Sequence, residues 1–407
     1  MTAATTDRAA IADLELRTRR FIRDVVIPAE PPAGTELRPE VRHELQARAR
    51  EAGVFGPQIP VAMGGHGLGL AAFAGIFQEA GYSPIGPSVL NCMAPDEGNM
   101  LLLERIASPE QHQRYLDPLA RGEMRSCFAM TEPHPGAGSD PASLATIAER
   151  DGDQWVIRGE KRFISGANEA SFAIVMARTP EVGPDAATLF LVQMDAPGVE
   201  IGRQIRTLET AITGGHPYVR FDDVRVGAEA VLGEPGEAFR HVQVRLGPAR
   251  LTHCMRWLGL ARRAHDTALD RVRARELFGA RMADLGIAQG LLADSEIDLA
   301  SVAAMITWAA DEVERDQRAG ATASSIAKVH CAEAIERVID RSVQLCGGDG
   351  VTLELPLIAF LNEVRPFRVY DGSSETHRWA IARRAVSRRR REIEAGESVL
   401  DAPAGRS

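Results

Sequence analysis

The segment from Tyr370 to Arg378 combines an acid, a glycine and several hydroxyl groups in a pattern that suits proton-transfer chemistry. Asp371 and Gly372 come first, and two serines follow them. Glycine lets a backbone come close to a ligand, and a carboxylate beside it can remove a proton from a carbon atom of that ligand. The segment therefore predicts a general base, Asp371, in a loop that also contacts a cofactor.

Two earlier segments indicate a flat aromatic ligand. The first is Phe128 to Asp140, in which Thr-Glu-Pro is followed by Gly-Ala-Gly-Ser-Asp. Its hydroxyl and consecutive backbone N–H groups can hydrogen-bond a heterocycle. In the second, Lys161 to Ala167, Phe163 can cover a ring face while Ser165 donates to the ring edge. The structural alternatives are a helix-to-strand loop and a strand end, and the second segment taken alone favours the strand end.

Two later segments suit phosphate groups. Arg275 stands just after a long helical pattern, and its forked donors match the oxygens of a pyrophosphate. Gln344 precedes the glycine pair Gly347-Gly348, where its amide can bond an adenosine or its phosphates. Each segment alone fits a surface arginine or a helix C-cap better, so their weight comes from occurring together.

The elements that must position these segments change type along the chain. The pattern is helical over residues 1–125, with apolar residues at helical spacing. Short apolar runs such as Ala173 to Met176 and Leu189 to Val192 then predict a small sheet or barrel over residues 126–236. Helical stripes return over 237–395, and 396–407 form a tail. This segregated α+β order excludes a doubly wound nucleotide fold, which needs alternating strands and helices.

Bulk properties exclude several classes of protein. The chain has 407 residues, 45% hydrophobic and 25% charged, which is enough for two or three domains with a large core. A net charge of −9 argues against a nucleic-acid binder or a protein of anionic membranes. The five scattered cysteines indicate neither a disulfide framework nor a zinc site, so no metal is expected. With no recognisable leader, these features predict a cytoplasmic protein.

Taken in this order, the five segments resemble the acyl-CoA dehydrogenase family, and the likeness runs from about Gly53 to Val386. The resemblance implies a helical domain, a β domain and a C-terminal four-helix bundle. It also implies non-covalently bound FAD, an acyl-CoA substrate, an electron-transfer flavoprotein as electron acceptor, and a homodimer or homotetramer.

The resemblance also assigns roles to residues. It implies that Met130, Thr131, Phe163 and Ser165 hold the isoalloxazine, and that Ser139, Arg250 and Gly372 contact the acyl-CoA. The remaining residues matched to FAD contacts are Arg275, Phe278, Gln344, Gly347, Gly348, Ser373 and Glu375. Of these, Arg275 and Gln344 with its glycine pair would reach the FAD of a neighbouring subunit.

The residue at the base position singles out one branch of the family. Most members carry glutamate there, whereas this chain has Asp371, which is shorter by one methylene. In this feature the chain resembles a branch of the family that includes dehydrogenases acting on long or 4-hydroxylated acyl chains. The reaction implied is α-proton abstraction with hydride transfer from the β-carbon to flavin N5, which forms a 2,3-enoyl-CoA. The alternatives are a flavin oxidase of the same fold, such as a nitroalkane oxidase, a flavin monooxygenase, and a non-catalytic acyl-CoA binder.

Overall fold

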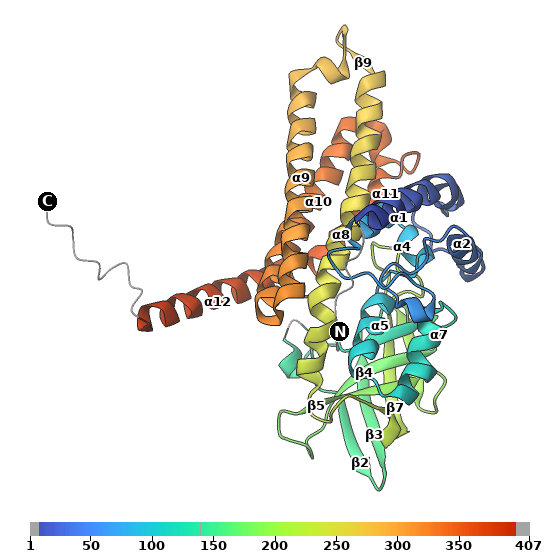
Figure 1. Cartoon of the computed structure of the whole chain (residues 1–407), viewed down its shortest axis with the longest axis vertical. Helices are drawn as coiled ribbons and strands as arrows, with labels where there is room; N and C mark the ends of the chain where they lie inside the picture. The colour runs from blue at the N-terminus through green and yellow to red at the C-terminus, as the bar shows by residue number, and fades with distance from the viewer. Residues whose placement is uncertain (1–7, 139, 396–407) are drawn as a thin grey trace, which may run out of the picture.

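The computed structural model describes residues 8–138 and 140–395, and it has the predicted order of a helical part, a sheet and a second helical part (Figure 1). The predicted tail, 396–407, and Ser139 lie outside the described residues. The sheet lies at one end of the molecule, and the long C-terminal helices extend away from it toward the other end (Figure 1).

Short helices build the N-terminal part and pack against the middle of the long helix α8. A Cβ atom on Gly81 would lie 2.0 Å from the backbone oxygen of Arg256, and one on Gly259 would lie 2.0 Å from that of Gln78. The two backbones can approach this closely only because both positions are glycine. The helices are α1 (Arg8–Phe21), α2 (Pro39–Glu51), α3 (Ala74–Ala80), α4 (Gly86–Val89), α5 (Asp96–Ile106), α6 (Pro109–Gln111) and α7 (Asp117–Ala120).

An eight-stranded sheet forms the central part, in the order β6-β7-β3-β2-β4-β5-β8, with β1 pairing with β4. The predicted apolar runs form β4 and β5, which pair antiparallel and are buried on both faces. Phe172 of β4 packs into the core shared with the helices, whereas Ala173 packs into a second core on the opposite face. The strands are β1 (Ser126–Ala129), β2 (Ile147–Asp151), β3 (Gln154–Lys161), β4 (Phe172–Arg178), β5 (Ala187–Gln193), β6 (Val199–Gln204), β7 (Pro217–Gly227) and β8 (Val231–Leu232).

Three long helices dominate the C-terminal part: α8 (Ala238–Ala274), α9 (Gly286–Arg315) and α10 (Gln317–Cys346). Their predicted apolar stripes are buried, as Met255, Ile306 and Ile339 illustrate with no exposed surface. A small hairpin, β9 (Glu276–Leu277) and β10 (Ala280–Arg281), joins α8 to α9. Helix α11 (Leu357–Val364) packs on α10, and α12 (Ser374–Glu394) projects from the body (Figure 1).

Across the part of the chain that the structure describes, no helix combines the length and apolar character needed to span a bilayer.

Candidate active site

The loop that carries Asp371 has a constrained backbone. It joins a short 3₁₀ helix, Arg365–Arg368, to α12, and Asp371 and Gly372 have φ angles of 54° and 90°. Non-glycine residues seldom adopt a positive φ, and such residues cluster at functional sites. A Cβ atom on Gly372 would lie 2.7 Å from Nε2 of His377, so this turn requires glycine. Ser373 accepts from the backbone N–H of Thr376 and caps α12.

Three side chains hold this loop through its carbonyl groups. The Nε atom of Arg250 donates to the backbone oxygen of Asp371 at 3.1 Å, and His377 Nε2 contacts the same oxygen at 2.9 Å. Lys328, on α10, donates to the backbone oxygen of Gly372 at 2.6 Å. Because these donors bond carbonyl groups, they fix the loop without using the oxygens of the Asp371 carboxylate.

The Asp371 carboxylate faces a buried histidine. Its Oδ2 atom lies 3.4 Å from Nε2 of His253, and the Asp371 side chain keeps 19% of its surface exposed. Burial holds the pKa of His253 well below its usual value, and the nearby cations Arg256, Arg245 and Lys328 lower it further. His253 is therefore a neutral imidazole that can donate one N–H toward the Asp371 carboxylate.

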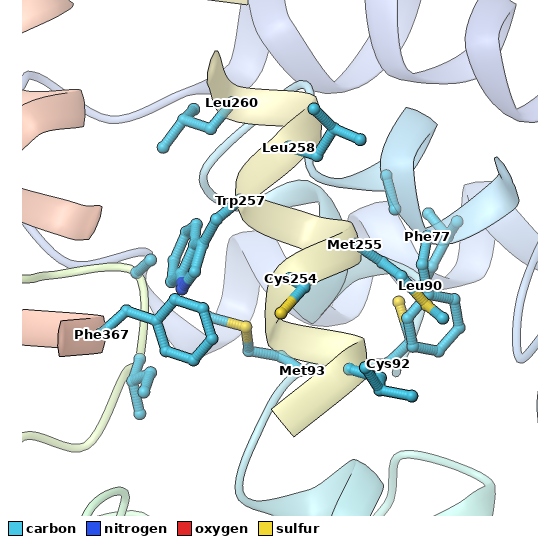
Figure 2. Close-up of a cluster of buried hydrophobic side chains, with 14 of the residues drawn as sticks. Phe77, Leu90, Cys92, Met93, Cys254, Met255, Trp257, Leu258, Leu260 and Phe367 are labelled. Carbon is cyan, nitrogen blue, oxygen red and sulfur yellow. The ribbon is translucent and has the colours of Figure 1, made fainter. Parts of the chain in front are cut away.

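Aromatic rings surround this pair. The His253 ring centroid lies 4.9 Å from that of Tyr370 and 5.4 Å from that of Phe367. Trp257 Nε1 donates to the Tyr370 hydroxyl at 2.8 Å. Figure 2 shows Trp257 and Phe367 on one side of α8 and Phe77 and Leu90 on the other, with sulfur-containing side chains between them. The loop around Asp371 and Gly372, named the base loop here for the base predicted in it, thus rests on a packed apolar core, which limits its movement.

At the edge of the sheet, the two predicted ring-binding segments lie side by side. The backbone N–H of Arg162 donates to the carbonyl oxygen of Thr131 at 2.8 Å. The Thr131 side chain beside this contact is only half-buried. Phe163 has a φ of 57° and keeps 43% of its surface exposed, although it is a large apolar residue. A half-buried hydroxyl beside an exposed ring in a constrained backbone fits a flat, hydrogen-bonding group such as a flavin ring.

Glu132 anchors the first of these segments from inside the protein. Its carboxylate pairs with the fully buried Lys161 at 2.8 Å and accepts from the backbone N–H groups of Ala137, Ala145 and Thr146. Burial favours the protonated acid, but the ion pair and these hydrogen bonds outweigh it and lower the pKa of Glu132 to about 2. Glu132 is therefore a charged structural residue that shapes the loop after Thr131.

The second segment is held by a histidine. The Ser165 hydroxyl and Nδ1 of His216 are 2.9 Å apart, and burial lowers the pKa of His216 to about 4. The imidazole is therefore neutral at pH 7. This contact orients Ser165 next to Phe163.

The predicted phosphate-binding residues lie at the opposite end of α8. Arg275 directly follows this helix, and its Nη1 atom would lie 3.4 Å from a Cβ atom on Gly347, so the two predicted segments meet. Gln344 and Gly348 are exposed beside them. Phe278 is 96% exposed at the tip of the β9–β10 hairpin. A helix rises about 37 Å over the 25 residues from Arg250 to Arg275, so these two arginines lie far apart along α8.

The structure therefore groups the predicted residues in three places. Asp371, Gly372, Ser373 and Arg250 meet at the base loop, and Glu375 lies exposed in the first turn of α12. Met130, Thr131, Phe163 and Ser165 lie together at the edge of the sheet and form the predicted ring-binding edge. The third group, Arg275, Phe278, Gln344, Gly347 and Gly348, lies far from the base loop. Ser139 cannot be placed, because it lies outside the described residues.

Sequence reasoning missed three residues that surround Asp371: His253, Lys328 and His377. His253 follows Arg250 by three positions, which places it on the adjacent turn of the same helix face. This spacing could have indicated from the sequence that His253 lies near Arg250 in the site. Lys328 lies within an unremarkable helical pattern, whereas His377 belongs to the segment from Tyr370 to Arg378; only the tertiary contacts reveal what either side chain does.

Comparison with known families agrees with this architecture. The N-terminal, middle and C-terminal domain models of acyl-CoA dehydrogenase match residues 11–123, 127–224 and 236–386. The chain is 35% identical to (R)-benzylsuccinyl-CoA dehydrogenase of Thauera aromatica over 91% of this chain and 93% of that protein. Animal relatives described as acyl-CoA dehydrogenase family member 11 also match, and the chain spans about half of their length.

Solved structures share the fold. A putative acyl-CoA dehydrogenase from Mycobacterium abscessus superposes with a TM-score of 0.87 at 33% identity, over 93% of this chain and 98% of that one. A glutaryl-CoA dehydrogenase from Mycobacterium smegmatis in complex with FADH2 superposes with a TM-score of 0.79 at 25% identity, over 94% of this chain and 97% of that one. The present chain belongs to the acyl-CoA dehydrogenase family of flavin oxidoreductases.

Proposed function

We propose that this protein is an FAD-dependent acyl-CoA dehydrogenase that converts an acyl-CoA to a 2,3-enoyl-CoA, with Asp371 as the base. The observation that carries the proposal is the Asp371 loop, whose backbone is held in a left-handed conformation by Arg250 and His377 while the carboxylate stays accessible. A base needs a fixed position and free oxygens, and this arrangement supplies both.

In this reaction the α-proton passes to the Asp371 carboxylate as the Cα–Cβ double bond forms. FAD, when bound, supplies the acceptor for the hydride that leaves the β-carbon. Met130, Thr131, Phe163 and Ser165 would hold its ring system at the edge of the sheet. Arg250, Lys328 and His377 hold the base loop so that the carboxylate does not have to be ordered during the reaction.

The FAD site would be completed by a second subunit, so the smallest active assembly would be a homodimer. Support comes from the separation of about 37 Å along α8 between Arg250, beside Asp371, and Arg275, because one active site cannot use both residues of the same chain. Arg275, Phe278, Gln344, Gly347 and Gly348 would reach the cofactor of the neighbour. Ser373 and Glu375 would contribute from the start of α12.

The remaining assignments also belong to this proposal. The CoA thioester class is supported by the family and by the relative named for (R)-benzylsuccinyl-CoA. Ser139, Arg250 and Gly372 would contact the acyl-CoA, and an electron-transfer flavoprotein would accept the electrons. A cytoplasmic location is supported by five buried free cysteines. The aspartate at position 371 supports placing this chain in the branch of the family that acts on long or 4-hydroxylated acyl chains.

Anaerobic flavin bleaching with a panel of acyl-CoAs and nitroalkanes tests the proposal. We expect an acyl-CoA to bleach the flavin with formation of enoyl-CoA. Asp371→Asn should retain FAD but lose this reaction, whereas Asp311→Asn, an exposed acid of α9, should behave as wild type. Bleaching by nitroalkanes alone, with rapid reoxidation in air, would establish a flavin oxidase instead.

A further inference from the structure

Arg245 is a buried cation without a counterion of its own. Only 7% of its surface is exposed, and it lies on α8, five residues before Arg250. Within residues 8–138 and 140–395, no carboxylate comes within ion-pair distance of its guanidinium. Burial lowers the pKa of Arg245, because it removes the charge from water.

The contacts of Arg245 engage one edge and one face of the guanidinium. Its Nε atom donates to the neutral oxygen Oδ1 of Asn99 at 2.8 Å. The guanidinium carbon lies 4.3 Å from the ring centroid of Phe128, and the side chain packs over Gly98, where a Cβ would come within 3.3 Å. No hydrogen bond of its two terminal nitrogens is found in the described part of the chain. These nitrogens form the pair that binds an anion in a bidentate manner.

The acids nearest to Arg245 are engaged elsewhere. Asp96 accepts from Arg125 and from both the N–H and the hydroxyl of Ser126. Glu97 accepts from Thr252 at 2.9 Å and lies 3.6 Å from Arg256. Asp371 faces His253. All three carboxylates are close enough to oppose the fall in the pKa of Arg245, but none of them pairs with it.

The position of Arg245 relates it to both parts of the site. It is within electrostatic range of the base Asp371, and it stacks on Phe128, two residues before Met130 of the ring-binding edge. A ligand with one end at Asp371 therefore lies close to an unpaired cation. Burying a charge is costly unless a partner compensates it, and a substrate anion would do so.

We propose that Arg245 binds an anionic substituent, a carboxylate or a phosphate ester, on the acyl chain of the substrate. This inference rests on the proposed acyl-CoA dehydrogenase function and names the chemical class of its substrate. The planar guanidinium fork suits both anions, so the proposal concerns their shared chemistry.

Binding of unreactive CoA thioethers tests the proposal separately from catalysis. Each neutral S-alkyl-CoA is compared by calorimetry with an ω-carboxyalkyl and an ω-phosphooxyalkyl thioether of the same length, for chains of four to six atoms. We expect wild type to bind at least one anionic form about tenfold or more tightly than its neutral match, as a charge-assisted hydrogen-bond pair would give.

Variants assign that preference to a residue. Arg245→Gln should lose the preference, Arg245→Lys should keep part of it, and Arg262→Gln should keep all of it. Arg262 lies on the same helix, 17 residues away, or about 25 Å. If Arg245→Gln is poorly folded, the wild-type preference and the Lys variant still decide the question. Equal binding of neutral and anionic thioethers by wild type, or an unchanged preference in Arg245→Gln, would contradict the proposal. Arg245 would then serve only to hold α5, α8 and β1 together.

Flavin bleaching separates the two proposals. Bleaching by neutral acyl-CoAs as well as by dicarboxylic or phosphorylated ones of equal length would overturn the anion site and leave the dehydrogenase in place. Bleaching by no acyl-CoA would overturn the dehydrogenase itself. Bleaching favoured by the anionic substrates supports both.

Discussion

The Nε2 atom of His253 lies 3.4 Å from Oδ2 of Asp371, and both side chains lie between α8 and the loop before α12. His253 is 5% exposed, and its Nδ1 atom has no partner in the described residues. We propose that this neutral imidazole is a positioning residue, because it can orient one carboxylate oxygen and leave the other for the substrate.

We predict that His253→Ala lowers the rate of flavin reduction by about 10²-fold, because a base displaced by about 1 Å loses its alignment. The change should fall on kcat, with KM little altered. His253→Gln should recover part of the rate, since its amide can donate in place of the imidazole. Stopped-flow bleaching measures both variants, and equal rates for the Ala and Gln variants would reduce His253 to a packing residue.

Because burial and neighbouring cations hold the pKa of His253 well below its usual value, its titration should not appear in the neutral range. The pH profile of flavin reduction should therefore contain no step near pH 6.5 that His253→Gln removes. Comparing the two profiles from pH 6 to 8 checks this expectation. A step present only in wild type would mean that His253 carries a proton in the functional range.

Gly372→Ala should slow flavin reduction while the protein stays folded. The new Cβ would approach His377 Nε2 to 2.7 Å at a φ of 90°, so the turn and the carbonyl contacts beside Asp371 must shift. We expect a loss of about tenfold or more in rate. Gly290→Ala is the matched control, because this helical position has open space around it. A Gly372→Ala variant as fast as wild type would show that the loop geometry is not needed for the reaction.

Glu132→Gln should destabilise the protein by about 3 kcal/mol, because it leaves the buried Lys161 without its counterion. The pKa of Glu132 in the folded state, about 2, lies below its usual 4.5, so its charge stabilises the fold above pH 4.5 and this contribution is lost as pH falls toward 2. Urea unfolding should therefore show a smaller difference between wild type and variant at pH 4 than at pH 7.

A double variant, Glu132→Gln with Lys161→Met, serves as the control for Glu132. Removing the unpaired cation as well should recover part of the lost free energy of unfolding. An equal difference from wild type at both pH values would instead assign the effect of Glu132 to its hydrogen bonds and shape.

Phe278→Asp should weaken both self-association and FAD retention. Phe278 is an almost fully exposed aromatic side chain at a hairpin tip, and the proposed assembly would bury it against a neighbouring subunit. Light scattering and the ratio of flavin to protein absorbance measure the two effects. Val61→Asp, at another exposed apolar side chain, is the control and should change neither. A Phe278→Asp protein with unchanged mass and flavin content would contradict the role of this hairpin.

Much of the fold was predictable, because helical and strand periodicity depend on neighbours in the sequence. The buried run of β4 that includes Ala173 and the buried stripe that includes Ile339 follow directly from such patterns. The segments with Asp371, Thr131, Phe163 and Arg275 were also visible, since they combine unusual residue types over short spans. What residue spacing could not show was which of these segments meet.

The sequence by itself determined the order of the three parts, and it predicted a base residue and segments suited to a flavin. Only the tertiary structure placed His253, Lys328 and Arg250 around Asp371, at sequence separations of 118, 43 and 121 residues. It also placed Arg275 far from that loop and left Arg245 buried without a counterion. Such contacts depend on how helices pack over long chain distances, and the pairing or isolation of a charge is a property of that packing.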